Sequence, residues 1–385
     1  MSFHLPTKSE CDAICEQTAA FYRRDRKVEG FNVAIYDYRL ASLSDFIQYN
    51  AFELRGLCFV ENTASSWERN LLMNKFFNIN QTKGWMYDDV KDKEIVSVTN
   101  KEDGSIISFV KFPNGKVRAK SKASFDSTQA EMAQKVYNEN GSLRKFVENC
   151  ISLHEVPIFE LVSPENQIVL VYPETELVLL QIRTENGDYA SRKIAAYADE
   201  FGISCREEFN NNCHKNLDYL LDQKDKNKED IEGWVVSFGD GQMAKIKTNK
   251  YLSIHGLLAP NNIRENLIVE TILDGNIDDV ISVCTGRKRI ELEKVNEQVE
   301  KAFNNYVVEL IRLHDEFCNK HNRNRKSFAI KYSNQHTLFP TFMSSVSKEE
   351  DFSKVEELAE NSAKSFIKKN CKTVSSAKTF LESLQ

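Results

Sequence analysis

The stretch Lys101-Glu102-Asp103-Gly104-Ser105 places a lysine beside two carboxylates and a glycine. A β-type run at 94–99 precedes it and another at 106–112 follows it, so we expect the lysine in a tight connection between two strands. Gly104 can adopt backbone angles that other residues avoid. A neutral lysine amine held there can attack a phosphorus atom. By itself K-x-D-G is more typical of a charged turn, so this interpretation requires a nucleotide pocket from the rest of the chain.

Two further lysines predict a surface that binds an anion. In Ala244-Lys245-Ile246-Lys247 the alternation of a strand places Lys245 and Lys247 on one face. Two cations on one face repel each other unless an anion lies over them. Cations beside Lys101 would also favour its neutral form. They would stabilise the charge that develops on an α-phosphate and on the leaving pyrophosphate.

Carboxylates in the same part of the sequence suit Mg²⁺, which prefers hard oxygen ligands. Glu160 interrupts an apolar strand at 157–162, and Glu232 stands at the head of another at 231–236. Asp278 is a third candidate. A surface position and a buried functional position are both open for Glu160, because its neighbours on either side are apolar.

An arginine and a lysine near aromatic residues are further candidates for phosphate contacts. Arg55 precedes Gly56 within an expected strand at 52–60, where a glycine often marks close approach by a ligand or another backbone. Arg55 either binds phosphate or pairs with Glu53. Lys75 precedes two phenylalanines that form either core or the wall on which a purine stacks.

The elements that must position these residues follow from hydrophobic periodicity. We expect a helix at 8–24 that ends in Arg23 and Arg24, and a strand at 31–38 that ends in Tyr38. Asn114-Gly115 is a hairpin signal, and the returning strand brings Lys120 and Lys122 beside the lysine turn without ranking them. We also expect a helix at 128–150 and strands at 168–172 and 177–183.

Composition and length indicate two domains. The chain has 385 residues, a net charge of -6, and nine cysteines without C-x-x-C pairs, which favours reduced thiols in the cytoplasm. No apolar run approaches the ~20 residues of a membrane span, and the start lacks a signal-peptide pattern. The acidic balance argues against a general nucleic-acid coat, although a local basic cleft stays open.

We therefore predict an α+β fold: an antiparallel-sheet domain at 1–255 followed by an all-α domain at 256–385. The second domain contains an apolar stripe at three-four spacing, from Leu292 to Phe317, which is typical of a core-facing helix. Arg323, Arg325 and Lys326 lie outside this stripe, and the sequence does not decide whether they contact RNA.

The order of the motifs K-E-D-G-S, F-E-L-V, I-E-G-W and K-I-K resembles the covalent nucleotidyltransferase superfamily of ligases and capping enzymes. More narrowly, E-L-R-G, K-F-F-N and K-x-K-A-S make the chain similar to the RNA ligase 1 family of tailed bacteriophages. This resemblance covers about residue 38 to beyond residue 330.

The resemblance implies that Lys101 carries AMP, that Lys122 and Tyr251 are needed for catalysis, and that Asp278 lies at a metal. The residues assigned to nucleotide binding are Tyr38, Arg55, Lys75, Glu160, Glu232, Lys245 and Lys247.

The function expected from this resemblance is ATP- and Mg²⁺-dependent joining of RNA 5′-phosphate and 3′-hydroxyl ends through lysyl-AMP and RNA-adenylate intermediates. The implied substrate is cleaved tRNA. We expect a monomer in the cytoplasm, which is that of an infected host cell if the chain is phage-encoded. A DNA ligase or capping enzyme is an alternative, although those usually append a β-barrel where this tail is expected to be helical. A non-catalytic RNA-binding protein on the same scaffold is another.

Overall fold

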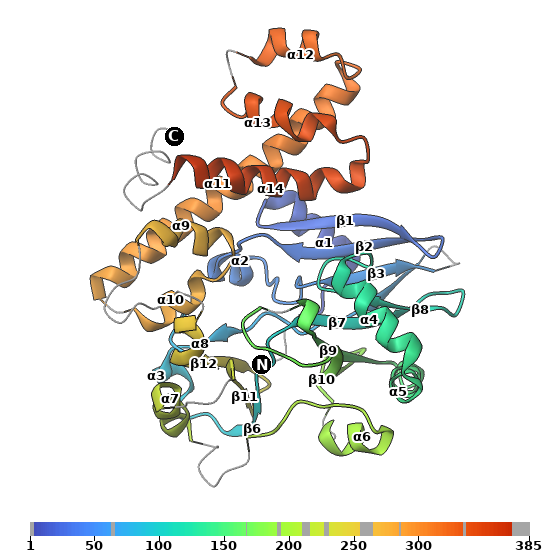
Figure 1. Cartoon of the computed structure of the whole chain (residues 1–385), viewed down its shortest axis with the longest axis vertical. Coiled ribbons are helices and arrows are strands. Elements are labelled where there is room, and N and C mark those ends of the chain that lie inside the picture. The colour runs from blue at the N-terminus through green and yellow to red at the C-terminus, as the bar shows by residue number, and fades with distance from the viewer. Residues whose placement is uncertain are drawn as a thin grey trace. The chain divides into compact units, whose positions relative to one another are not determined.

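The computed structural model describes residues 4–62, 66–166, 168–190, 194–209, 216–226, 231–254, 265–284, 286–333 and 336–371. The chain forms two compact units (Figure 1). The first comprises 1–16, 21–38 and 43–260, and the second comprises 17–20, 39–42 and 261–385. The expected boundary between residues 255 and 256 lies outside the described residues.

The first unit contains three four-stranded sheets. In one sheet the strands β1 (Phe21–Val28), β2 (Phe31–Tyr38), β3 (Leu57–Glu61) and β4 (Trp67–Asn70) follow one another in antiparallel order. The strand β1 lies at the edge of this sheet. The predicted strand at 31–38 is confirmed with the same bounds, whereas the predicted strand at 52–60 begins only at Leu57.

The second sheet carries the strands on either side of the Lys101 turn. Its order is β10 (Glu176–Thr184), β9 (Glu155–Val162), β7 (Ser105–Lys111) and β8 (Val117–Lys120), and every pair is antiparallel. The helices α4 (Thr128–Glu139), α5 (Gly141–Ser152) and α6 (Ile194–Phe201) cover one face of it. Phe109, Phe146 and Phe159 lie in the apolar core between sheet and helices.

The third sheet carries the lysine pair. Its order is β5 (Phe77–Asn78), β12 (Met243–Lys247), β11 (Gly233–Phe238) and β6 (Ile95–Asn100). Two of its pairings are antiparallel, and β12 with β5 is parallel. The remaining helices of this unit are α1 (Lys8–Gln17), α2 (Leu43–Gln48), α3 (Tyr87–Val90), α7 (Leu217–Lys226) and α8 (Asn249–Ile254).

The predicted helix at 8–24 is wrong in its second half. The helix α1 ends at Gln17, and Arg23 and Arg24 lie in β1, which pairs along its whole length with β2. Every backbone bond of that ladder comes from residues of a different segment, so the periodicity of 8–24 alone cannot reveal it.

The second unit consists mainly of helices in its described residues. It also includes two short segments from the start of the chain, 17–20 and 39–42. Its helices are α9 (Glu265–Leu273), α10 (Ile277–Val283), α11 (Gly286–Asn319), α12 (Arg325–Tyr332), α13 (Phe339–Ser344) and α14 (Phe352–Asn370). The predicted apolar stripe lies on α11, and Val295, Val299 and Leu313 are fully buried. Arg39 donates hydrogen bonds to Glu356 and Glu360 of α14.

The described helices include none that combines the length and the apolar character needed to cross a membrane. Taken together, the sheets and helices form a mixed α and β fold, with mostly antiparallel sheets and a helical C-terminal region.

Candidate active site

Three neighbouring strands bring Lys101, Glu232 and Lys247 to one end of the third sheet. The backbone N–H of Lys101, which follows β6, donates to the carbonyl of Gly233 in β11 over 2.9 Å. Gly233 is in turn the register partner of Lys247 in β12. A side chain at Gly233 is excluded, because a Cβ there would lie 2.0 Å from the carbonyl oxygen of Ile246. The three functional side chains therefore come from adjacent positions in a fixed ladder.

Glu232 binds both lysines at once. Its Oε2 atom lies 2.6 Å from Lys101 Nζ, and its Oε1 atom lies 3.0 Å from Lys247 Nζ. Glu232 is 2% exposed. Burial alone would raise its pKa, but the charges of Lys101 and Lys247 outweigh burial and hold the pKa below its usual value. The carboxylate is therefore ionised and fixes the position of the predicted nucleophile.

The turn that follows Lys101 is anchored through Asp103. One carboxylate oxygen of Asp103 accepts hydrogen bonds from the backbone amides of Val169 and Leu170, each over 2.8 Å. The other oxygen accepts from the Tyr251 hydroxyl, also over 2.8 Å. Three donors on a buried carboxylate make the turn rigid. Tyr251, predicted to be needed for catalysis, thus reaches the turn through Asp103.

Tyr172 holds the same turn from a second direction. Its hydroxyl donates to Glu102 Oε2 over 3.1 Å and accepts from the Asp103 amide over 3.0 Å. Close packing continues at Gly104, where a Cβ would lie 2.2 Å from the Leu161 carbonyl oxygen. The glycine of the motif is required here for space, because the backbone of β9 occupies the volume of a side chain.

Lys245 is the electrostatic centre of the site. Burial lowers its pKa well below the usual value, and the charges of Lys75, Arg55, Lys101 and Lys247 lower it further. Its Nζ atom lies 5.1 Å from the centre of the Phe76 ring. The described neighbours that set its pKa are therefore cations, and an added anion would be attracted to this position.

Lys122 and Lys75 approach Tyr38 at the end of β2. Their Nζ atoms lie 4.6 and 5.1 Å from the centre of the Tyr38 ring. Lys122 also pairs with Asp37 over 3.0 Å. Burial opposes ionisation of Tyr38, but the charges of Lys75 and Lys122 outweigh it and lower the pKa of this phenol. These contacts form a positively charged aromatic wall suited to a nucleotide.

The structure places Lys120 and Lys122 differently, a distinction that the sequence left open. Lys120 is fully buried, and its Nζ donates to the carbonyls of Gly56, Ser121 and Lys122. The Lys122 side chain is 38% exposed and contacts Tyr38. Gly56 permits this packing because it has a positive φ of 76° and a Cβ would lie 2.3 Å from the Lys122 carbonyl oxygen. Lys120 supports the segment, and Lys122 is the lysine that reaches Tyr38.

Arg55 does not pair with Glu53, which was the alternative role. Glu53 binds Arg183 in a fully buried pair, with Oε1 to Nη2 over 2.9 Å and Oε2 to Nη1 over 3.2 Å. Arg55 instead donates to the Met73 carbonyl over 3.3 Å, and its guanidinium lies 5.9 Å from the Phe76 ring centre. Phe76 itself is 6% exposed and belongs to an apolar core.

Carboxyl groups near Lys101 have the chemistry of a cation site. Burial raises the pKa of Glu160 to about 7, against the opposing charge of Lys101 and with support from Glu232. Burial also raises the pKa of Glu102. Crowded carboxyls favour a hard cation. The described residues contain no group of three or more His, Cys, Asp or Glu side chains arranged around one metal position. Asp278 lies in the first turn of α10 in the second unit, and its metal role stays a prediction.

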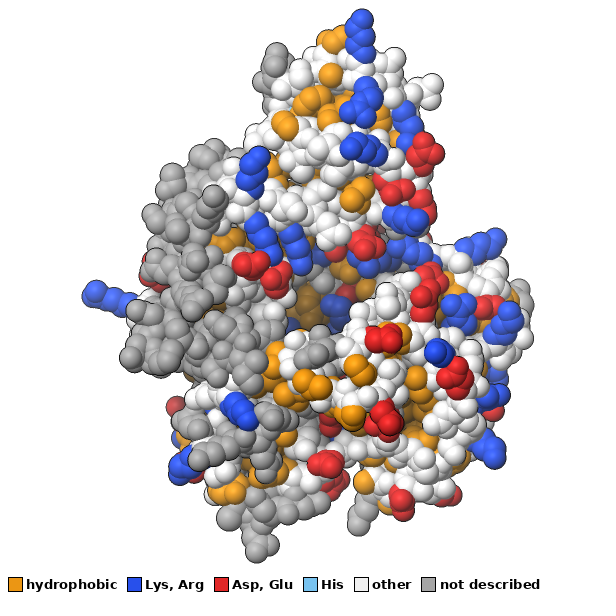
Figure 2. Space-filling view, viewed as in Figure 1, with side chains coloured by type: hydrophobic (Ala, Val, Ile, Leu, Met, Phe, Trp, Pro, Cys, Tyr) orange, Lys and Arg blue, Asp and Glu red, His pale blue; other side chains and the backbone are white. Residues whose placement is uncertain are grey.

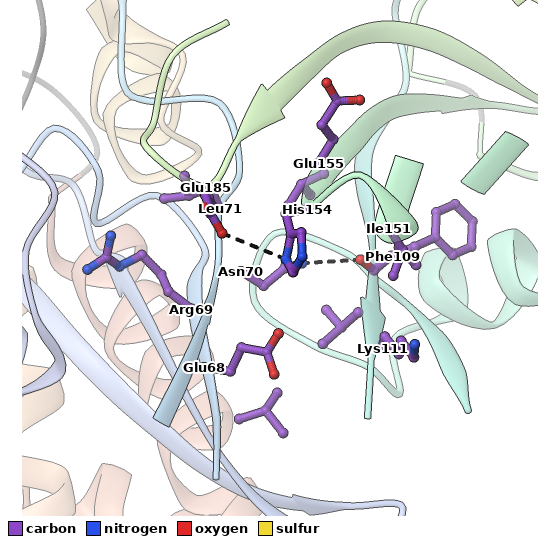
Figure 3. A pocket seen from close by; sticks show the side chains of 13 residues that line it. Glu68, Arg69, Asn70, Leu71, Phe109, Lys111, Ile151, His154, Glu155 and Glu185 are labelled. Atoms are coloured by element: carbon purple, nitrogen blue, oxygen red, sulfur yellow. Dashed lines mark hydrogen bonds and ion pairs between the residues drawn. The ribbon is translucent and has the colours of Figure 1, made fainter. Parts of the chain in front are cut away.

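A separate cavity of about 250 Å³ lies in the first unit, at the ends of β7 and β9 opposite to the Lys101 turn (Figure 3). His154 pairs there with Glu185 over 3.7 Å, and Asn70 donates to the Phe109 carbonyl over 3.2 Å. Its lining mixes both charge signs, so it lacks the excess of cations that a triphosphate requires.

The structure thus brings together Tyr38, Arg55, Lys75, Lys101, Lys122, Tyr251, Glu160, Glu232, Lys245 and Lys247 in one part of the first unit, by direct contact or through their mutual charges. Sequence reasoning missed Asp37, Tyr172 and Arg183. Asp37 lies beside the predicted Tyr38, and the alternation of β2 pointed its side chain to the opposite face. Tyr172 binds the Lys101 turn from a loop, and Arg183 binds Glu53 from β10. No local sequence pattern indicates either contact.

Comparison with known proteins gives one family. A family model described as RNA ligase matches residues 53–251. A curated protein named "Putative RNA ligase" from Thermovibrio ammonificans is 25% identical over 240 residues, which is 60% of this chain and 61% of the relative. The chain thus matches about three-fifths of the length of that relative.

Two solved structures are also similar. An archaeal ATP-dependent RNA ligase (form 2) is 10% identical with a TM-score of 0.49, covering 98% of this chain and 95% of that one. A Naegleria gruberi RNA ligase with PPi is 13% identical with a TM-score of 0.38, covering 66% and 84%. Both TM-scores lie below 0.5.

Proposed function

The chain belongs to the RNA ligase family, and from this premise we propose that it is an ATP-dependent RNA ligase that acts through a covalent lysyl-AMP. The observation that carries the proposal is the position of Lys101. It lies on a rigid turn, hydrogen-bonded to Glu232, in a site where burial and the surrounding cations hold the pKa of Lys245 well below its usual value. A lysine in such a site can act as a nucleophile toward a bound phosphate.

In the first step Lys101 Nζ loses one proton to water, attacks the α-phosphorus of ATP and gives a second proton to water as the phosphoramidate forms. A phosphorus–nitrogen bond forms, the bond from the α-phosphorus to the bridging oxygen breaks, and pyrophosphate leaves with the bonding electrons. The neutral amine can keep one N–H on Glu232 while its lone pair points to phosphorus, so this hydrogen bond would orient the nucleophile. The negatively charged triphosphate would compete with Glu232 for Lys247.

The cations of the site would hold the phosphates. A bound anion would offset the repulsion between Lys245 and the neighbouring cations, so the pKa of Lys245 would rise and its amine would gain a proton. Lys247 would turn from Glu232 to the same anion. Arg55 lies beside the ring of Phe76 and Lys75 lies beside the ring of Phe77, and both side chains would contact the phosphates or the ribose. These preorganised charges stabilise the negative charge that develops on the leaving group.

Glu160, with Glu232 beside it, would hold a divalent cation such as Mg²⁺ at this position. The fit rests on the raised pKa of Glu160, since a neighbouring cation would remove the electrostatic cost of its ionised form. A bound cation supplies charge neutralisation at the phosphates. The chain itself supplies the oxygen ligands and keeps Glu102 and Asp103 bound to Tyr172.

In the later steps the AMP would pass from Lys101 to an RNA 5′-phosphate, and an RNA 3′-hydroxyl would displace it to form the phosphodiester. Cleaved tRNA as substrate, a monomeric state and a cytoplasmic location stay predictions. The DNA ligase and capping alternatives differ in the nucleic acid or nucleotide that they use. The non-catalytic alternative is disfavoured because the side chains of Lys101, Glu232 and Lys247 remain in contact.

The test is incubation of the full chain with α-labelled ATP or GTP and Mg²⁺, followed by acid precipitation. We expect acid-stable label from ATP, which 5′-phosphorylated RNA discharges into a joined product while DNA ends give less. Absence of covalent label would overturn the proposal. Label from GTP in preference to ATP would favour the capping alternative.

A further inference from the structure

A buried carboxylate, Asp37, interrupts an apolar face of β2. Val33 and Ile35 on the same face lie in an apolar core that also contains Phe112 and Phe125. Alternation places Asp37 at the next position of this face, where it is 1% exposed. An apolar side chain there would extend the core, whereas a buried carboxylate carries a cost of desolvation unless a cation compensates it. The carboxylate therefore requires a positive charge close by.

Lys122 supplies this charge. Asp37 Oδ2 lies 3.0 Å from Lys122 Nζ, and the Tyr22 hydroxyl donates to the same oxygen over 3.4 Å. The other oxygen, Asp37 Oδ1, is buried and has no hydrogen-bond partner within the part of the chain that the structure describes. An unsatisfied buried oxygen is unfavourable for the fold. The contact with Lys122 is thus the feature that favours a carboxylate at this position over an apolar residue.

Two contacts hold Lys122 in place. Its backbone segment, which follows β8, is fixed by Lys120, whose Nζ donates to the carbonyls of Gly56 and Lys122 over 2.9 and 3.4 Å. Its ammonium group is fixed by Asp37 and lies 4.6 Å from the centre of the Tyr38 ring. A lysine side chain has a flexible stem, and that of Lys122 is 38% exposed, so several orientations are open without the pair. Asp37 selects the orientation that reaches Tyr38.

The charge of Lys122 depends on the same pair. Burial lowers the pKa of Lys122, but the charges of Asp37 and Tyr38 outweigh burial and raise this pKa above its usual value. The titratable and charged groups that act on Lys122 are Asp37, Tyr38, Arg55 and Lys120. Of these, Asp37 is the carboxylate, and two of the others are cations. Removal of the Asp37 charge would therefore lower the pKa of Lys122.

The candidate active site uses this arrangement twice. Glu232, 2% exposed, binds Lys101 and Lys247 from the start of β11. Asp37 binds Lys122 from the end of β2. In both places a buried carboxylate on a strand determines where a lysine ammonium group lies before a ligand binds. Charges that are already oriented stabilise a reacting group without the cost of reorganisation.

We propose that Asp37 is the positioning residue of Lys122, which it holds beside Tyr38 as a charged donor to the bound nucleotide. The inference rests on the proposed function for the identity of that nucleotide as ATP, and it adds the residue that controls Lys122. Asp37 acts through Lys122 and is not itself assigned a contact with the substrate.

The first test is the pH dependence of lysyl-AMP formation at saturating ATP, between about pH 6 and about pH 10. Asp37→Asn keeps the shape of the side chain, but Lys122 would lose its proton at lower pH than in the wild type. The ratio of the variant rate to the wild-type rate should therefore fall as pH rises, by up to about tenfold for each pH unit above the lowered pKa. A ratio that stays constant with pH would indicate a merely structural loss and overturn the inference.

Lys122→Arg provides a matched background for the same substitution. Arginine stays protonated over this range, so the rate of Asp37→Asn/Lys122→Arg relative to Lys122→Arg should not change with pH. A decrease with pH as large as in the wild-type background would show that Asp37 acts through another group.

Glu29→Gln is the control for the loss of a paired carboxylate. Glu29 accepts from Lys116 and Arg118, each over 2.7 Å, at the end of the β1–β2 hairpin opposite to Asp37. Basic and acidic side chains lie next to one another on the edge of the first unit where β8 lies in Figure 1 (Figure 2). This variant should keep the wild-type dependence of rate on pH.

A second measurement needs no activity. The pKa of Lys122 is followed by ¹³C NMR of the full chain labelled at the lysine Cε atoms, with Lys122→Arg used to assign the signal. This pKa should fall in Asp37→Asn and stay unchanged in Glu29→Gln. Asp37→Leu, which extends the apolar face of Val33 and Ile35, replaces Asp37→Asn if the latter does not fold. An unchanged pKa of Lys122 after loss of the Asp37 carboxylate would also overturn the inference.

Failure of the proposed function gives a different result. If the wild-type chain forms no lysyl-AMP, the catalytic proposal is wrong, whereas the NMR titration still reports whether Asp37 controls the ammonium group of Lys122.

Discussion

Lys101 Nζ lies 2.6 Å from Glu232 Oε2, and this pair connects the end of β6 to the start of β11. The predicted nucleophile is therefore bound by a buried carboxylate that also binds Lys247. The pair positions the amine, and a neutral amine can keep one N–H on Glu232 while its lone pair points to phosphorus.

Replacement of Lys101 by arginine should abolish covalent AMP transfer. The guanidinium keeps the positive charge and can still bind Glu232, but it stays protonated and has no lone pair for attack. The measurement is acid-stable label from α-labelled ATP, with nucleotide binding followed separately by calorimetry. Retention of ATP binding without label is the expected pattern. A variant that still takes up label would show that another residue is the nucleophile.

Replacement of Lys245 by methionine should change the proton balance of ATP binding. Burial and the surrounding cations lower the pKa of Lys245 in the free site, and a bound triphosphate would raise it, so the wild-type chain should take up protons when ATP binds. Calorimetry in two buffers with different ionisation enthalpies measures this uptake. The uptake should fall in Lys245→Met and stay unchanged in the exposed control Lys83→Met. Equal uptake in Lys245→Met and wild type would contradict the assignment.

The sequence predicted which residues come together around Lys101 better than it predicted the elements that frame them. Lys101, Glu232, Lys245 and Lys247 lie on strands or at strand ends with clear alternation, and these strands form as expected. The expected strand at 168–172 does not form, because the amides of Val169 and Leu170 donate to Asp103 instead of to a ladder. That choice depends on a carboxylate more than sixty residues away in the sequence, which no local pattern shows.

The edge strand β1 could not be recognised for a similar reason. Its stability comes from eight register pairs with β2, so the tertiary pairing overrides the helical periodicity read across 8–24. In the second unit, Arg323 and Arg325 donate to the carbonyls of Glu349 and Met343. The basic segment considered as an RNA contact therefore has a structural role in at least two of its three residues, and its contact with RNA stays a prediction.

Replacement of Glu53 by glutamine should destabilise the chain strongly. Both Glu53 and Arg183 are buried, and the neutral amide leaves the Arg183 charge without compensation. Breaking a buried pair in this way costs about 3–5 kcal/mol. The partly exposed pair of Asp240 with Lys93 provides the control, since Asp240→Asn should cost less than about 1 kcal/mol. Urea unfolding measures both values. Similar costs for the two variants would show that the Glu53 pair contributes little.

Replacement of Glu160 by glutamine should change how stability depends on pH. Burial raises the pKa of Glu160 from 4.5 to about 7, so between these values the folded chain binds more protons than the unfolded chain. The wild-type free energy of unfolding therefore falls as pH rises through this range, and glutamine removes that fall. The melting temperature of Glu160→Gln relative to wild type should increase from pH 5 to pH 8. The exposed control Glu165→Gln should show no such trend, and parallel curves for both variants would contradict the raised pKa.

Replacement of Tyr172 by phenylalanine tests whether the Lys101 turn must be held rigidly for attack. The change removes one donor to Glu102 and one acceptor for the Asp103 amide, while the aromatic ring stays in place. Hydrogen bonds of this kind contribute about 0.5–3 kcal/mol, depending on the charge of the partner. A loss of about 1.4 kcal/mol in the positioning of Lys101 corresponds to a tenfold slower attack.

The effect of Tyr172→Phe should fall on the rate of lysyl-AMP formation and leave ATP affinity unchanged, because Tyr172 contacts the turn and none of the cations assigned to the phosphates. Tyr197→Phe is the matched control, since its hydroxyl binds Asn149 on α5, away from the turn. A merely structural role would lower the melting temperature of both variants and slow neither. Single-turnover measurements at saturating ATP separate these outcomes, because they report the attack of Lys101 independently of nucleotide binding.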